Sequence, residues 1–141
     1  MGDQENKNIA FIQSLYDAFR RGDLPFILKN LSEDVKWTLE GPSVLPFAGK
    51  RTGVAQVQQF FEALASGETN QRLTIESLVA QGDQVAALGR FAATVTATGR
   101  SYDSPVAHFF TLRGGKVSRF VEVAETAAPA EAYRAGAAAA R

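Results

Sequence analysis

Residues 105–123 read PVAHFFTLRGGKVSRFVEV, and they decide the fold because two apolar runs are joined by a pair of glycines. This pattern is typical of a β-hairpin. The first run carries His108, the only histidine of the chain, and the second carries Glu122. The hairpin therefore predicts an imidazole and a carboxylate on neighbouring strands, which is the usual equipment for general acid and base catalysis near neutral pH.

The length of the turn determines whether these side chains share a face of the sheet, because paired residues of an antiparallel hairpin do so. With a two-residue loop over the glycines, His108 pairs with Val121, and Glu125 is the acid on the same side. With a three-residue loop that ends in a G1 bulge, His108 pairs with Phe120 and shares a face with Glu122. The glycine pair permits both turns, so Glu122 and Glu125 remain alternatives for the acid.

Length and composition are typical of a single domain with a small-molecule partner. The chain has 141 residues, 15 basic and 15 acidic, so it carries no electrostatic footprint for nucleic acid. Without cysteine and with one histidine, neither a disulfide nor a metal site is expected. The N-terminus is polar and no stretch approaches the length of a membrane span, which predicts a cytoplasmic protein that makes no membrane contact. We expect one domain over residues 1–141 and no cofactor.

Apolar spacing predicts three helices and then a series of strands. The expected helices run from residue 9 to the glycine at 22, from 24 to 31 with Asp23 as the cap, and from 54 to 65. Strands are expected at 35–39, 73–80, 85–98, 105–112 and 117–123, and the apolar loop 41–49 is expected to fold over other parts of the chain. This order predicts an α+β fold with the helices on one face of an antiparallel sheet. The alanine-rich tail, 128–141, is compatible with a loose helix or a frayed end.

Short motifs in a fixed order carry a family resemblance. They are YDAF at 16–19 with GDL at 22–24, DVKW at 34–37, PFAGKRTG at 46–53, His108, and GKV at 115–117. In this order they make the chain similar to the SnoaL-like polyketide cyclases of the NTF2-like superfamily over about residues 8–127. The resemblance implies a cone-shaped α+β barrel, in which a curved sheet and three helices enclose a deep apolar pocket.

The resemblance also implies residue roles. Polyketide cyclases of this family close a ring by intramolecular aldol chemistry without metal or organic cofactor, using an acid on the last strand and a histidine on the strand before it. His108 and Glu122 match these positions, although the cyclases carry Asp where this chain has Glu, and a shift of about 1 Å can cost a factor of about 10². The match favours the bulged register. That register leaves an apolar outer face and so predicts a homodimer; the outward residues are Ala107, Phe109, Val121 and Val123.

Two other enzyme types of the superfamily match less well. Ketosteroid isomerase needs a tyrosine on the first helix and an aspartate near the first strand. Leu15 and Leu39 occupy those positions, with Tyr16 and Glu40 one residue away, and a one-residue slip on a strand reverses the face. The epoxide hydrolases need an Asp-Arg-Asp arrangement inside the cavity, for which Arg90 alone is not sufficient.

Aromatic residues are candidates for the pocket wall, which would suit a flat or polyketide-like ligand, and the alternative is that they are ordinary core. They are Tyr16, Trp37, Phe47, Phe60, Phe91, Phe110 and Phe120. Two hypotheses follow. In the first, the protein is an enzyme in which Glu122 moves a proton next to a carbonyl and His108 binds the oxygen or relays the proton. In the second, it is a non-catalytic module that binds a hydrophobic molecule or serves in assembly.

Overall fold

A computed structural model describes residues 2–139 of the chain, with side chains for residues 2–134. In chain order the elements are α1 (Asp3–Arg21), α2 (Leu24–Lys29), β1 (Leu31–Leu39), β2 (Gly49–Thr52), α3 (Val54–Gly67), β3 (Glu68–Gln81), β4 (Gln84–Val95), β5 (Ser101–Arg113), β6 (Lys116–Ala124) and α4 (Ala127–Ala139). No helix within residues 2–139 combines the length and the apolar character needed to cross a membrane.

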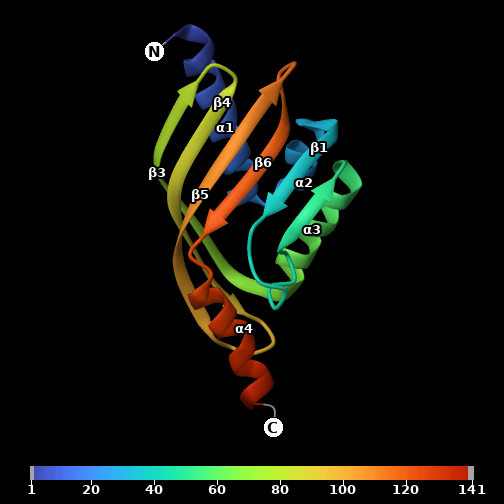
Figure 1. The fold of residues 1–141 in the computed structure, drawn as a ribbon, viewed down its shortest axis with the longest axis vertical. Coiled ribbons are helices and arrows are strands. Elements are labelled where there is room, and N and C mark those ends of the chain that lie inside the picture. The colour runs from blue at the N-terminus through green and yellow to red at the C-terminus, as the bar shows by residue number, and fades with distance from the viewer. Residues whose placement is uncertain (1, 140–141) are drawn as a thin grey trace.

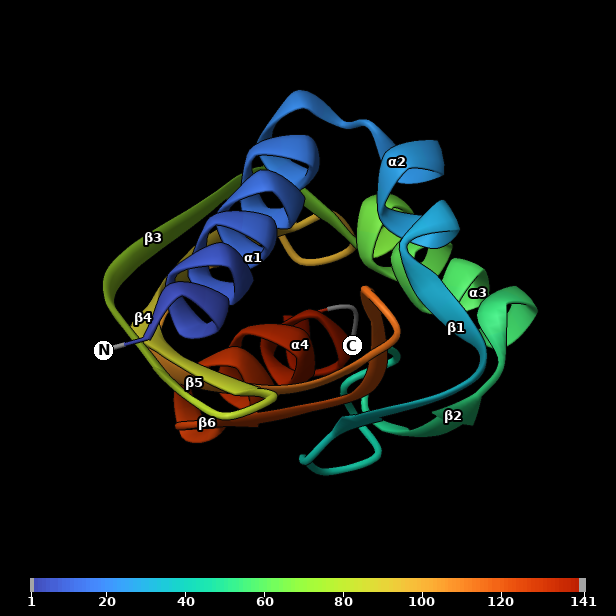
Figure 2. The same ribbon diagram turned by 90° about the horizontal axis from the view of Figure 1, so that it is seen from above.

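The strands form one curved sheet in the order β2-β1-β6-β5-β4-β3, which confirms the α+β class (Figure 1). Seen from above, the sheet curves around the helices but does not close, since β2 and β3 remain edge strands (Figure 2). The expected antiparallel pairing holds from β3 through β6, whereas β1 joins β6 in parallel. The result is a half-open cone rather than a closed barrel.

Two local signals place the first helices. Gly22 ends α1 with a φ of 73°, and the Asp23 side chain accepts a hydrogen bond from the Phe26 backbone N–H at 3.2 Å. Helix α2 ends earlier than expected, at Lys29 with Asn30 as its C-cap, and the Asn30 carbonyl accepts a hydrogen bond from the Val117 N–H of β6 at 2.9 Å. Residues 31–34, expected to end the helix, therefore begin β1.

Two strand segments carried no sequence signal. Strand β2 has the sequence GKRT and pairs antiparallel with β1, while β3 begins with ETNQR, five residues before its expected start. Neither segment has the alternation of apolar and polar residues by which strands are recognised. Both lie at or near the edges of the sheet, where pairing with one neighbour is enough to define a strand.

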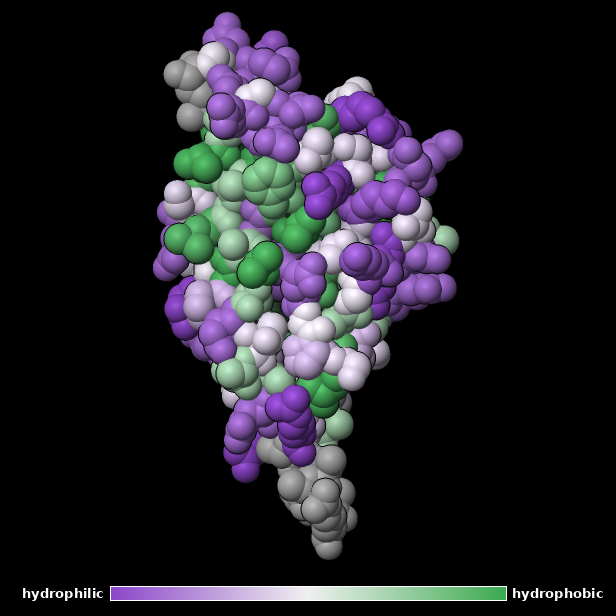
Figure 3. Space-filling view, viewed as in Figure 1, coloured by the Kyte–Doolittle hydropathy of each residue, from purple (hydrophilic) through white to green (hydrophobic). Residues whose placement is uncertain are grey.

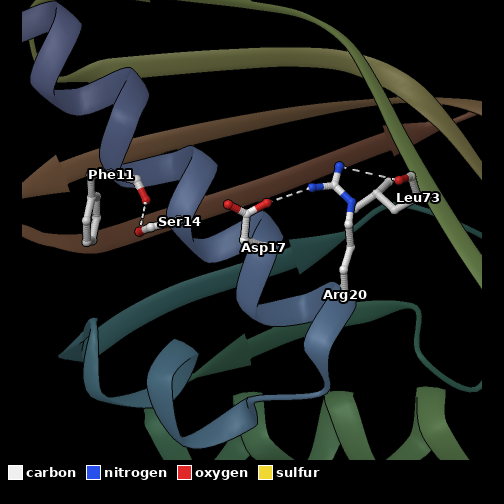
Figure 4. A network of polar contacts seen from close by, with 5 residues as sticks. All are labelled: Phe11, Ser14, Asp17, Arg20 and Leu73. Carbon is white, nitrogen blue, oxygen red and sulfur yellow. Dashed lines mark hydrogen bonds and ion pairs between the residues drawn. The ribbon is translucent and has the colours of Figure 1, made fainter.

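Helix α1 is fixed to the sheet by an apolar face and by one arginine near its end. Ile12 and Leu15 are buried on the sheet side of the helix. In the last turn, Arg20 donates to the Asp17 carboxylate at 3.1 Å and to the Leu73 carbonyl of β3 at 3.5 Å (Figure 4). The arginine thereby joins the helix to the edge strand β3.

The alanine-rich tail forms helix α4, at the end of the molecule opposite the N-terminus (Figure 1). The Glu125 side chain accepts from the Ala127 backbone N–H at 2.8 Å and so caps its first turn. Ala132 is buried in a small cluster with Ala93, Val95 and Tyr102. The tail is thus ordered by packing as far as it is described; residues 140–141 lie outside the described part.

Gly89 marks a close approach between β4 and β3. A Cβ atom at this position would lie 2.1 Å from the Thr74 carbonyl oxygen, which is backbone and cannot rotate away. We expect Gly89→Ala to lower the free energy of unfolding by about 1–3 kcal/mol, the usual cost of overpacking, as measured by urea denaturation. Gly41→Ala is the control, because its Cβ would meet only side-chain atoms, the nearest being Leu45 Cδ1 at 3.2 Å. Equal losses in both variants would contradict this explanation.

Candidate functional site

The central hairpin has the two-residue turn of one expected register, but its pairing farther from the turn differs from both. Gly114 and Gly115, with φ of 58° and 77°, form a two-residue loop between Arg113 and Lys116. An extra residue, Ser118, then shifts the pairing within β6, and its hydroxyl donates to the Thr111 carbonyl at 3.1 Å. The bulge is therefore in the strand, not in the loop.

This bulge places His108 directly opposite Glu122, so the expected common face is correct although the expected partner, Phe120, is not. His108 Nε2 lies 2.7 Å from Glu122 Oε1. Phe110 and Phe120 pair with each other on the same buried face. Phe109 and Val123 are exposed on the other face, as the bulged register predicted.

A third group completes the polar cluster. The Tyr16 hydroxyl, from α1, lies 2.8 Å from His108 Nδ1. Tyr16, His108 and Glu122 thus form a continuous hydrogen-bonded chain from helix to sheet, which we call the polar triad. Burial, together with the negative charge of Glu122, raises the pKa of the Tyr16 hydroxyl, which therefore keeps its proton.

Both ring nitrogens of His108 are engaged. With Glu122 ionised, Nε2–H donates to the carboxylate, and in the neutral ring Nδ1 accepts from the Tyr16 hydroxyl. Among residues 2–134, no hydrogen bond reaches Glu122 Oε2, and the Glu122 side chain is 18% exposed. The group best placed to meet a ligand is therefore the carboxylate, not the imidazole.

The polar triad lines an apolar cavity of about 110 Å³. All seven aromatic wall candidates line it: Tyr16, Trp37, Phe47, Phe60, Phe91, Phe110 and Phe120. The loop between β1 and β2 covers one side of the cavity with Leu45 and Phe47, which are both buried. A cavity of about 150 Å³ accepts benzene, so a larger ligand must displace part of this wall.

The aromatic wall is closely packed around the polar triad. The rings of Trp37 and Phe120 stack at 4.1 Å between centroids, and Phe120 lies 5.1 Å from the His108 ring. The Trp37 indole nitrogen is buried and has no hydrogen-bond partner among the described residues. Because Trp37 is the only tryptophan, its fluorescence reports on occupation of the cavity.

Other candidates lie outside the polar cluster. Glu125 is exposed and caps α4, so it is not the acid that faces His108. Arg90 pairs with Asp103 at 2.9 Å, with both side chains about half exposed. Glu40 lines the cavity but is exposed. Leu15 and Tyr16 both line the cavity, because consecutive residues of a helix are rotated by only about 100° around its axis.

Sequence reasoning missed a second buried carboxyl group. Glu68, at the start of β3, is 3% exposed, and its Oε2 accepts hydrogen bonds from the hydroxyls of Tyr102 at 2.5 Å and Tyr133 at 2.9 Å. Burial raises the pKa of Glu68, while the tyrosine hydrogen bonds act in the opposite direction. Glu68 occurs in a polar segment, and the sequence around it therefore gave no sign of burial. The only available signal was that Tyr102 and Tyr133, its hydrogen-bond partners, occur in segments with few other large side chains.

The fold and the site together define an α+β cone with an apolar cavity and, in its wall, the hydrogen-bonded polar triad. The model of the SnoaL-like domain family matches residues 12–120, and the chain belongs to this family. No curated protein is a significant match.

Solved structures place the chain among NTF2-like proteins. An NTF2-like protein of unknown function from Burkholderia pseudomallei is 27% identical, with a TM-score of 0.83 over 89% of this chain and 96% of that one. TerC, co-crystallized with polyporic acid, is 26% identical, with a TM-score of 0.80 over 90% and 98%. A candidate polyketide cyclase from Xanthomonas campestris pv. campestris is 25% identical, with a TM-score of 0.72 over 84% and 90%.

The raised pKa of Glu68 predicts a pH dependence of stability. Between the unfolded pKa of about 4.5 and the higher folded pKa, the folded state holds more protons, so stability falls as pH rises. We therefore expect the free energy of unfolding of the parent, relative to Glu68→Gln, to decrease from pH 4.5 upward, as measured by urea denaturation. If the parent instead gains stability relative to the variant over this range, the hydrogen bonds from Tyr102 and Tyr133 lower the pKa of Glu68 more than burial raises it.

Proposed function

We propose that this protein is a cofactor-independent enzyme that transfers a proton next to a carbonyl group of a hydrophobic, ring-bearing or polyketide-like substrate. The observation that carries the proposal is the hydrogen-bonded polar triad in the wall of an otherwise apolar cavity. Membership of the SnoaL-like family supports the reaction class.

In the proposed reaction Glu122 is the base. Its carboxylate takes the proton from the carbon next to the carbonyl, the C–H electron pair moves into the carbonyl, and an enolate oxygen forms. When His108 carries protons on both nitrogens, its Nδ1–H donates to Tyr16, whose own hydrogen is then free to reach that oxygen. His108 would thus act through Tyr16 rather than touch the substrate, consistent with the hydrogen bonds of its two nitrogens.

The class of ligand follows from the wall. Aromatic side chains surround the polar triad, and flat rings pack well against such surfaces. TerC, which is similar in fold and was crystallized with polyporic acid, supports a ring-bearing ligand. Because the cavity is small, a ring-bearing substrate must displace part of the wall when it binds.

We propose further that a second copy of the chain covers the outer face of the sheet. Four large apolar residues are exposed there on neighbouring strands, namely Val79, Leu88, Phe109 and Val123 (Figure 3). Leu88 and Val123 both pair with Ala107, and Val79 and Phe109 both pair with Ala86, so the exposed residues form neighbouring rows across the outer face. An apolar patch is self-complementary, as a twofold dimer requires, and the chain has no net charge to oppose association.

The reaction can be tested with 4-phenylbutan-2-one, a ketone that carries one ring. Deuterium incorporation next to its carbonyl in D₂O, followed by NMR, measures the proton transfer directly. We expect Glu122→Gln to slow the exchange by about 10²–10⁴. Binding of the ketone, followed by Trp37 fluorescence, should persist because the substitution is nearly isosteric.

Glu125→Gln is the matched control, because Glu125 carries the same group on the same segment of chain but caps α4. It should exchange as fast as the parent. If Glu122→Gln retains full exchange activity, or if the parent binds the ketone without any exchange, the enzyme proposal is wrong and a non-catalytic binding module replaces it.

The outer face can be tested by charge. We expect Leu88→Lys to produce monomers at a micromolar concentration at which the parent sediments as a dimer, because a buried unpaired charge opposes association. Gln59→Lys, which adds the same charge on the exposed face of α3, should leave the dimer intact. A parent that sediments as a monomer, or a dimer that Leu88→Lys does not disturb, would overturn the proposal.

A further inference from the structure

The cavity has a second polar region, remote from the polar triad. Strand β5 points alternate side chains inward, and three of these carry polar groups: Tyr102, Ser104 and His108. His108 lies four positions after Ser104, which corresponds to roughly 14 Å along the strand. The inner face of β5 thus carries polar groups at two separate places, with Val106 between them.

Ser104 is the central residue of the remote region. It is 2% exposed and lines the cavity, and no side-chain hydrogen bond joins it to residues 2–134. The Glu125 N–H donates to the Pro105 carbonyl at 3.1 Å and continues the ladder of β5 and β6, which brings Thr126 beside Ser104. Thr126 also lines the cavity. Two hydroxyl-bearing side chains that line the cavity therefore lie at neighbouring register positions.

The groups behind Ser104 determine which chemistry would fit. The hydroxyl protons of Tyr102 and Tyr133 are both directed to Glu68 Oε2, so neither is free to donate elsewhere. Glu68 does not line the cavity, so the groups that a ligand can meet at this end are the hydroxyls of Ser104 and Thr126. Each hydroxyl both donates and accepts, and a ligand hydroxyl can do the same with both, whereas a carbonyl or an anionic oxygen can only accept.

We propose that Ser104, assisted by Thr126, binds a hydroxyl group on the part of the substrate remote from the reacting carbonyl. The substrate class is then an elongated hydrophobic ketone with a hydroxyl, such as a phenol, at its far end. This inference rests on the proposed function for the position of the carbonyl, but the binding of the hydroxyl is independent of catalysis. Ser104 is a specificity residue in this scheme and takes no part in proton transfer.

Two ketones that differ only at the far end test the proposal. They are 4-(4-hydroxyphenyl)butan-2-one and 4-(4-methylphenyl)butan-2-one, in which a methyl group replaces the hydroxyl at similar size. Calorimetric titration should show that the parent binds the hydroxyl ketone about fivefold more tightly, as one net hydrogen bond provides. Ser104→Ala should bring the ratio close to one, while Glu122→Gln should leave it unchanged.

The outcomes separate this proposal from the enzyme proposal. A ratio that survives Ser104→Ala, a ratio lost in Glu122→Gln, or a parent that binds neither ketone or both equally would overturn the hydroxyl subsite. Deuterium exchange recorded on the same ketones tests catalysis separately. If the parent prefers the hydroxyl ketone in a way that depends on Ser104 but catalyses no deuterium exchange, the subsite is supported and the enzyme proposal is wrong.

Discussion

The extra residue at Ser118 is the constraint on which the site depends. Side chains alternate along a strand, so one inserted residue reverses the face of everything that follows it. Before the bulge, Val117 is buried; after it, Phe120 is buried again and Glu122 follows on the inner face. Without the insertion Phe120 would point outward, and the aromatic wall and the polar triad would be lost together. The same irregularity therefore serves the packing of the core and the position of the acid.

Polar groups inside an apolar wall are stable only when they bind one another. Tyr16, His108 and Glu122 meet this requirement almost completely, since both nitrogens of the imidazole have partners. The arrangement holds the imidazole in one orientation and leaves one carboxylate oxygen without a partner among the described residues. A site of this kind needs little reorganisation when a substrate enters, which is the condition under which a weak base can be effective.

Much of the fold could be predicted from local signals. Gly22 and Asp23 set the end of α1 and the start of α2, and the apolar loop 41–49 was expected to fold over other parts of the chain. What failed was long-range: the parallel pairing of β1 with β6, the edge strand β2 and the bulge at Ser118. None of these three features leaves a pattern in its own stretch of sequence, because each depends on which partner strand lies beside it in the folded chain.

The candidate site shows the same division. The aromatic wall and the pair His108 and Glu122 follow from alternation within two strands, which a sequence displays directly. The contact of Tyr16 with His108 joins residues 92 positions apart and was not predicted, although Tyr16 was a wall candidate. Glu68 was missed for a further reason: a glutamate in a polar segment is normally exposed, and only its two tyrosine partners make its burial tolerable.

The two carboxyl groups inside the cone, Glu68 and Glu122, have different environments. Glu68 is 3% exposed, accepts two phenol hydrogen bonds and does not line the cavity. The Glu122 side chain is 18% exposed, is bound on one oxygen by His108 and lines the cavity. The negative charge of Glu122 also contributes to the raised pKa of Glu68, so the two groups are coupled. A base must be able to reach its substrate. The proposed role therefore fits Glu122, which lines the cavity, and does not fit Glu68, which does not line it.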